Sequence, residues 1–354
     1  MIRHHFVPRL FFALVATLAG TSLAVAQEPL AAPLKKLAPT PIDAAGPPFM
    51  LDNGGPNQFN FASPGNGSSY LAGNTQFPNF IGFLSNPIQS IDPRAVTELW
   101  PMFGAGWVSA NKSILPSGNL QVYGAGLNVA VSDRLSFGLN QGGYAVANFA
   151  NDRETLRARL GLPVRDIDRG GEREGWLNLG GFVQYTLIAD VPNQFLLSAG
   201  LRVEAPAGST QLFQGGANPA YLSPYLTMGK ELGSFHFLAT TGYEFPAGSG
   251  AAATTNTCYL NLHLDRKIGW FYPLIELNGA RRTTNADIGF ATPRHGVIDL
   301  GTFTTTGNSL TGAYGANAVL IPGKLEIGAV YVRPLSAQNN FDASGMILKM
   351  VYRY

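Results

Sequence analysis

Cysteine is almost absent from this chain of 354 residues, which contains only Cys258. A single cysteine cannot form an internal disulfide, so packing and hydrogen bonds have to hold the fold. Charge is scarce as well. Asp, Glu, Lys and Arg make up 13% of the residues, whereas ordinary soluble domains contain about 25%. Together with 42 glycines, this composition favours a β-rich protein that meets lipid.

Long hydrophobic runs are also missing, with one exception at the start of the chain. Residues 10–26 are apolar, follow Arg3 and Arg9, and end in Ala-Val-Ala. This pattern is typical of a secretory signal peptide, and we expect residues 1–26 to be removed on export. An uncleaved anchor helix is the alternative. No later run approaches the ~18 apolar residues of a membrane helix.

The chain carries little net charge. It has 24 Lys and Arg against 22 Asp and Glu, and two of the cations lie in the expected signal peptide. A polybasic surface for nucleic acid is therefore not supported. We predict no nucleic-acid partner, no metal and no cofactor.

Alternation of apolar and polar residues replaces the missing runs. Residues 195–205, for example, place Leu201 and Val203 on one face and Arg202 and Glu204 on the other, as in a strand whose two faces meet different surroundings. The same period marks twelve segments, 96–108, 119–131, 134–149, 175–188, 194–205, 220–231, 234–245, 256–265, 270–281, 309–321, 324–333 and 345–354. Most exceed the ~5–6 residues of globular strands and match the ~9–11 of tilted membrane strands.

The connections between these segments alternate in length. Five are short, at 132–133, 189–193, 232–233, 266–269 and 322–323. Six are long, at 109–118, 150–174, 206–219, 246–255, 282–308 and 334–344. If both termini are periplasmic, every short turn falls on that side and every long loop outside, as in outer-membrane barrels. We therefore predict an all-β fold over residues 95–354, a transmembrane antiparallel up-and-down barrel of about 12 strands.

The final segment predicts how the barrel closes. One face carries two cations, and we expect the other to face lipid and the strand to close the barrel against the first one. The lipid-facing residues are Met346, Leu348, Met350, Tyr352 and Tyr354. Tyr352 and Tyr354 would lie at the inner interface, where aromatic rings are favoured. A terminal aromatic also resembles the assembly signal of bacterial outer-membrane proteins, which implies the barrel assembly machinery as a partner.

Further aromatic residues lie near the strand ends. We expect an outer girdle formed by Trp176, Tyr221, Tyr243 and Phe245. An inner girdle would be formed by Phe195, Phe235 and Phe271. Alternatively, these rings are simply good strand formers.

Two strand ends share a motif in which proline and glycine stop the strand. Residues 203–209 read VEAPAGS and residues 243–249 read YEFPAGS. Together with YPLIELNG at 272–279, these motifs resemble the outer-membrane transporters grouped with the MetA pathway of phenol degradation. The resemblance covers roughly residues 95–354. It implies movement of small hydrophobic or aromatic solutes across the outer membrane.

Charged and imidazole side chains occupy inward positions of the predicted strands. They are candidates for a lumen lining that selects solutes, and the alternative is that they pair across the lumen and serve the structure. The candidates are Arg202, Glu204, Glu244, Glu276, His236, His263, Glu326, Lys349 and Arg353. Glu326 and Arg353 lie near the inner ends of neighbouring strands and are placed to pair.

His236 and His263 point inward on adjacent predicted strands. They suit a metal or pH-sensitive pair, or the histidine of a lipid hydrolase. We favour ordinary lumen residues, because no Ser/His/Asp set emerges, and we predict no enzyme.

Residues 27–94 differ in composition from the barrel. Pro and Ala dominate 28–48, as in a flexible linker, but seven aromatics recur between Phe49 and Phe83, too many for a solvated linker. We predict a periplasmic linker whose part 77–94 packs against the inner end of the barrel or enters the lumen as a plug. In loop 150–174, a short helix over 152–160 either folds inward as a constriction or stays outside.

The most consistent function is passive passage of small solutes through a channel in the outer membrane of a Gram-negative-type bacterium. Its partners would be outer-membrane lipid and the solutes. The alternatives are a soluble secreted β-protein or surface module, and a lipid-acting barrel enzyme.

Overall fold

A computed structural model describes residues 71, 73–108, 117–149, 171–209, 212, 219–248, 256–284, 307–337 and 343–354. The expected signal peptide 1–26, residues 27–70 of the expected linker 27–94 and the expected helix 152–160 lie outside the described residues. Within the described ranges, no helix is long and apolar enough to cross a membrane.

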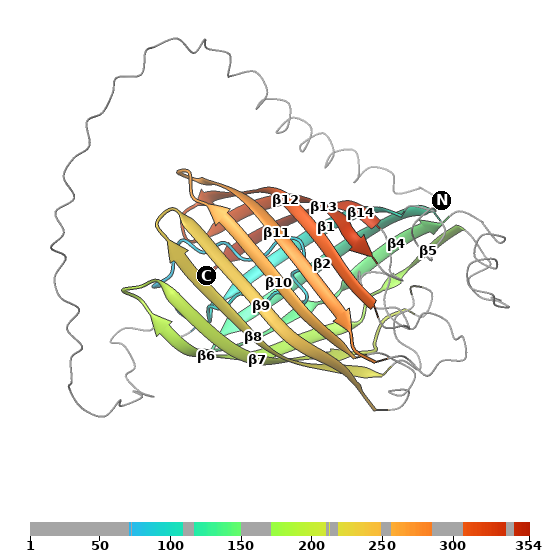
Figure 1. The fold of residues 1–354 in the computed structure, drawn as a ribbon, viewed down its shortest axis with the longest axis horizontal. Helices are drawn as coiled ribbons and strands as arrows, with labels where there is room; N and C mark the ends of the chain where they lie inside the picture. Colours follow the sequence, from blue (N-terminus) through green and yellow to red (C-terminus); the bar gives the residue numbers. More distant parts are fainter. Residues whose placement is uncertain are drawn as a thin grey trace, which may run out of the picture. The chain divides into compact units, whose positions relative to one another are not determined.

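The described part of the chain forms one antiparallel sheet of fourteen strands. The first seven are β1 (Glu98–Val108), β2 (Gly118–Ala130), β3 (Leu135–Gln141), β4 (Gly143–Phe149), β5 (Gly171–Trp176), β6 (Leu179–Asp190) and β7 (Phe195–Ala205). The others are β8 (Ala220–Leu232), β9 (Phe235–Ala247), β10 (Thr257–Arg266), β11 (Phe271–Arg282), β12 (Gly307–Ile321), β13 (Leu325–Ala337) and β14 (Ala343–Arg353). They run side by side and tilted around a closed cylinder (Figure 1).

Closure results from β1, which pairs with both β2 and β14. At the inner end of this seam, Glu98 lies opposite Arg353. Successive strands are neighbours around the cylinder, so the predicted antiparallel up-and-down barrel and its closing strand are confirmed.

Twelve strands close the barrel although fourteen elements are present, because two strands are interrupted. β3 and β4 both pair with β2, so together they occupy one strand position of the barrel. β6 pairs with β3 and β5 pairs with β4, so β5 and β6 together occupy the next position. The expected continuous strands 134–149 and 175–188 are therefore each broken, the first between Gln141 and Gly143, whose φ is 155°. A Cβ there would lie 2.2 Å from the carbonyl oxygen of Tyr123, so only glycine fits the break.

The two faces of the strands carry different side chains. In β7, Leu201 and Val203 are each 40% exposed on the outer surface, whereas Arg202 is 1% and Glu204 is 7% exposed inside. A soluble sheet would place them the other way round, since monomeric soluble proteins rarely expose contiguous apolar surface. The outer stripe continues around the barrel through Leu127, Phe137, Leu139, Val183, Leu226, Leu260, Leu264, Ile275, Leu277, Leu320 and Met350. The exposed apolar band is that of a transmembrane barrel.

Most of the expected girdle residues lie on the outer surface. Trp176, Tyr243, Phe235 and Phe271 are exposed there. The prediction for Tyr221 is wrong, because its ring is buried inside. It shares its face of β8 with Ser223, Tyr225 and Thr227, which are also buried.

The closing strand β14 has the predicted faces. Met346, Met350, Tyr352 and Tyr354 are exposed and Leu348 is half-buried on the same side, whereas Lys349 and Arg353 are buried inside.

Candidate functional site

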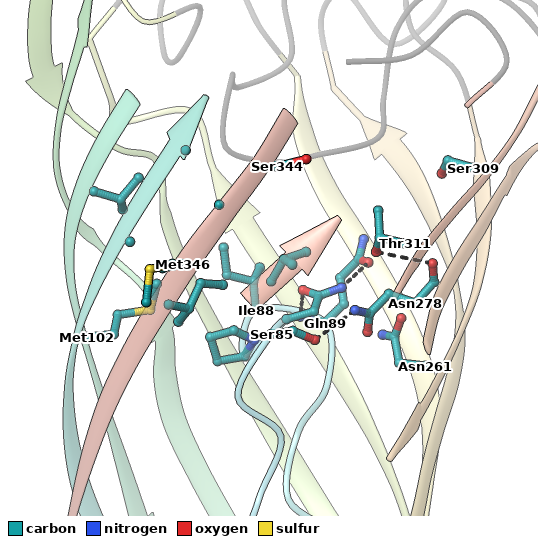
Figure 2. A pocket seen from close by; sticks show the side chains of 18 of the residues that line it. Ser85, Ile88, Gln89, Met102, Asn261, Asn278, Ser309, Thr311, Ser344 and Met346 are labelled. Atoms are coloured by element: carbon teal, nitrogen blue, oxygen red, sulfur yellow. Dashed lines mark hydrogen bonds between the residues drawn. The ribbon is translucent and has the colours of Figure 1, made fainter. Parts of the chain in front are cut away.

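The barrel lumen is occupied by the segment that precedes β1. We call residues 73–97 the luminal segment. Its rings Phe77, Phe80 and Phe83 are fully buried against the inward side chains Leu196 of β7 and Leu238 of β9. Figure 2 shows part of the segment, including Ser85, Ile88 and Gln89, enclosed by the strands.

Inward polar side chains satisfy the backbone of the luminal segment. This matters because irregular backbone inside a barrel forms no ladder and must find other partners. Five side chains of the wall each donate a hydrogen bond to a carbonyl oxygen of the segment. They are Asn140 to Ile88 (2.5 Å), Gln184 to Asp92 (2.9 Å), Ser198 to Pro93 (2.6 Å), Thr227 to Ile91 (2.8 Å) and Lys349 to Phe83 (3.0 Å).

Glu276 of β11 holds the middle of the segment. Its carboxylate accepts hydrogen bonds from the backbone N–H groups of Leu84 at 2.8 Å and Ser85 at 2.7 Å. The same carboxylate lies 2.7 Å from Nδ1 of His263. Each of its oxygens therefore has a charged or strongly polar partner, which a buried carboxylate requires.

His236 and His263 meet through a residue that the sequence analysis did not single out. Asp265 lies 2.5 Å from Nδ1 of His236 and 2.9 Å from Nε2 of His263. With Glu276 they form a buried chain across β9, β10 and β11. Asp265 shares the inward face of β10 with His263, and this alternation was the available signal.

A second group of charges lies in the outer half of the lumen. Arg202 pairs with Glu204 at 2.9 Å and with Glu244 at 3.3 Å, and it also donates to Gln141. The nearby amide of Asn178 donates to Glu204 at 2.8 Å.

A third group lies at the inner end of the seam. Arg353 donates to Glu98 at 3.1 Å and pairs with Glu326 on the other side. Asn128 and Asn317 add hydrogen bonds to these two carboxylates, at 2.9 Å and 3.1 Å. The sequence placed Glu326 beside Arg353 but did not identify Glu98, the first residue of β1.

All nine lumen candidates point inward, and each has a polar or charged partner. Among the described contacts, Lys349 is paired with a carbonyl group rather than a charge, and its Nζ also lies 4.8 Å from the centroid of the Trp100 ring.

The luminal segment contains an ion pair of its own. Arg94 binds Asp92 at 2.6 Å and donates to the carbonyl oxygen of Phe77 at 3.1 Å, which folds the segment back on itself. Burial alone raises the pKa of the Asp92 carboxyl, but Arg94 outweighs it and holds that pKa below its usual range. This pair was not predicted, because residues 77–94 were interpreted only through their aromatic rings.

Above the segment, the lumen retains a cavity of about 130 Å³. One side is polar, formed by Thr257 and Asn261 of β10, Asn278 of β11, Thr311 of β12 and Gln89 (Figure 2). The remaining wall is largely apolar, with Met102, Leu120, Val122, Val332 and Ile347. None of the lining residues that the structure describes is charged.

Comparison with known proteins gives structural likeness only. No protein-family model matches the sequence, and no curated protein sequence matches it. Among solved structures, the chain is similar to an outer-membrane channel from Pseudomonas putida F1, with 12% identity, a TM-score of 0.49, and coverage of 75% of this chain and 98% of that one. The motif resemblance had predicted a likeness to outer-membrane transporters.

Two other barrels show weaker likeness. The transport unit of the autotransporter AIDA-I from Escherichia coli has 12% identity and a TM-score of 0.41, covering 79% of this chain and 95% of that one. Salmonella typhi OmpF in complex with daunomycin has 8% identity and a TM-score of 0.33, covering 77% of this chain and 100% of that one. At such identities, a likeness says nothing of the solute.

Proposed function

We propose that this protein is an outer-membrane channel for small uncharged solutes, gated by the luminal segment. The observation that carries this proposal is a lipid-facing cylinder whose interior is filled at one level by a separate segment and retains, above that segment, a cavity with no charged residue in its described lining. Its partners in the membrane would be outer-membrane lipid and, during insertion, the barrel assembly machinery.

The size of the cavity favours a small solute. An apolar cavity of about 150 Å³ holds benzene, and the cavity here is of similar volume, at about 130 Å³. We expect it to take solutes with a small apolar body, including the small aromatic molecules that the motif resemblance implies.

The pairing of charges favours a neutral solute. Arg202, Arg353 and Glu276 already have partners of opposite charge. An ion entering the cavity would lose hydration without finding a counter-charge among the described lining residues, which is costly in a low-dielectric interior.

Passage through the inner half requires the luminal segment to shift. Phe77, Phe80 and Phe83 are buried at that level of the lumen, and in our proposal a solute passes only when they move. The segment therefore acts as a gate, closed in the arrangement described here.

A reversible tether tests the gate. Ser85 and Asn278 touch through a hydrogen bond of 2.8 Å, so Ser85→Cys with Asn278→Cys, in a Cys258→Ser background, allows a disulfide between segment and wall. In planar-bilayer recordings we expect about tenfold fewer openings in the oxidised protein, because the tether opposes the shift of the segment. Reduction should restore the openings.

The single-cysteine variants are the matched controls, and oxidation should leave them unchanged. Equal conductance before and after reduction of the verified disulfide would contradict the gate. Absence of conductance in every reduced form would contradict the channel itself.

A lipid hydrolase is less well supported. Both ring nitrogens of His263 face carboxylates, and His236 is fully buried, so neither imidazole is placed to activate a nucleophile toward a lipid ester. Phospholipid hydrolysis that disappears in both His236→Ala and His263→Ala would reverse this conclusion.

A further inference from the structure

The polar wall of the cavity contains buried groups without protein partners. Asn261 is 1% exposed, yet among the described residues neither its amide nitrogen nor its amide oxygen has a hydrogen-bond partner. The hydroxyl of Thr257, which is also 1% exposed, has none either. Leaving such groups unpaired is unfavourable, so their presence in a packed wall needs a reason.

Asn278 adds a third orphan group beside them. It lies directly opposite Asn261 in the pairing of β10 with β11. Its nitrogen donates to Ser85 at 2.8 Å, whereas its carbonyl oxygen has no partner. Figure 2 shows Asn261 and Asn278 adjacent on this wall, across the cavity from Met102. Together the three residues offer donors and acceptors on one side of the cavity.

We propose that Asn261 and Asn278 form a binding site for a neutral solute that has an apolar body and a hydrogen-bonding edge with both a donor and an acceptor. This site deepens the proposed function, since it gives the channel a chemical preference at its outer level. A few placed polar groups in a mainly apolar pocket are the usual composition of a small-molecule site.

The amide of Asn261 favours some polar groups of a solute over others. A primary carboxamide matches it, because each amide donates to the oxygen of the other. A carboxylate offers no donor to the orphan oxygens and adds an unpaired charge. A tertiary amide retains its acceptor but loses both donors.

Binding of benzamide to the full-length protein in detergent tests the site, with titration calorimetry as the readout. We expect one saturable site for benzamide. Benzoate and N,N-dimethylbenzamide should bind about tenfold more weakly or not at all, because each loses hydrogen bonds to the wall. No saturable binding of benzamide would mean that the cavity holds only water, and the proposal would fail.

Asn261→Leu provides the decisive variant, and Asn119→Leu, at an exposed position of β2, is its matched control. We expect Asn261→Leu to weaken benzamide binding about tenfold and the control to bind normally. Thermal stability of Asn261→Leu should be unchanged or higher, because it removes a buried group without a partner. A lower thermal stability of Asn261→Leu with an unchanged affinity for benzamide would show that Asn261 supports the fold and does not bind the solute. That result would overturn the proposal.

Asn261→Asp preserves the shape of the side chain and provides a second test of binding if the leucine variant does not fold. It removes both donors of the amide, so benzamide binding should weaken there as well. Calorimetry needs no conduction, so binding without conductance would reject only the proposed channel. Conductance without binding would reject only this site.

Discussion

The carboxylate of Glu276 accepts the backbone N–H of Leu84 at 2.8 Å, although the two residues are 192 positions apart in the chain. This contact joins the luminal segment to the middle of the barrel wall. Because Glu276 also binds His263, the position of the segment depends on a buried charge network and not on hydrophobic contact alone.

Replacing Glu276 by glutamine should loosen the segment while the barrel remains closed. Glutamine preserves the size but lacks the charge that holds Leu84, Ser85 and His263. Breaking such a buried pair typically costs about 3–5 kcal/mol. Hydrogen exchange should accelerate in peptides covering residues 80–90 and remain slow in β7 and β8.

The matched control for that variant is Glu172→Gln, since Glu172 is an exposed carboxylate of β5. It should leave exchange throughout the luminal segment unchanged. Equal protection of residues 80–90 in Glu276→Gln and the unmodified protein would show that the carboxylate does not hold the segment.

Replacing Arg353 by methionine should weaken the seam. The change leaves the buried carboxylates of Glu98 and Glu326 without their cation, at a cost of about 3–5 kcal/mol. The temperature at which the folded band disappears in unboiled gel electrophoresis should fall. Lys324→Met, at an exposed turn, should leave that temperature unchanged, and a similar loss in both variants would reject a special role for Arg353.

Gly242→Ala should destabilise the barrel by about 1–3 kcal/mol through overpacking. Gly242 lies opposite Tyr259 in the pairing of β9 with β10. A Cβ at Gly242 would lie 2.3 Å from the Tyr259 hydroxyl, which is engaged with Ser223 at 3.0 Å. Denaturant unfolding measures the loss.

Gly106→Ala is the control for this overpacking, because its new Cβ would find its nearest neighbour at an ordinary 3.7 Å. It should be neutral or slightly stabilising. Tolerance of alanine at Gly242 would mean that the Tyr259 ring is free to move aside.

Asp92→Asn should change the acid dependence of stability. Since Arg94 holds the pKa of Asp92 below its usual range in the folded protein, the folded state binds fewer protons than the unfolded state. The resulting stabilisation is complete above the unfolded pKa of about 3.9 and is lost as the pH falls through the folded pKa.

The unmodified protein should therefore unfold at a higher temperature than Asp92→Asn at neutral pH, and the difference should shrink below about pH 4. Thermal unfolding in detergent from pH 7 to pH 3 measures it. A difference that stays constant down to pH 3 would contradict the role of the Asp92 charge.

Much of the barrel could be predicted from the sequence because period-two alternation is a local signal. The approximate positions of the strands, the closing strand and the inward direction of Arg202 and Glu204 all follow from it, whereas the breaks within the segments 134–149 and 175–188 do not. Tyr221 was misplaced because an aromatic near a strand end was assigned to lipid without regard to the face that it shares with Ser223. The alternation of side-chain directions along β8 would have placed Tyr221 correctly.

The contents of the lumen could not be predicted in the same way. The luminal segment has no period, and its partners, such as Gln184 for Asp92, are set by the three-dimensional curvature of the wall. The orphan amide of Asn261 is likewise invisible in sequence, since only the packing around it shows that nothing satisfies it.

The seam between β1 and β14 sets the order in which the molecule can be assembled. Arg353 and Glu98 are 255 residues apart, so their contact has nearly the longest chain separation available and belongs to the slow, late part of folding. Before it forms, the sheet is an open surface on which the aromatic residues preceding β1 can settle. After the seam has closed, those rings would have to enter through one end of a complete barrel. The barrel wall would therefore close around the luminal segment.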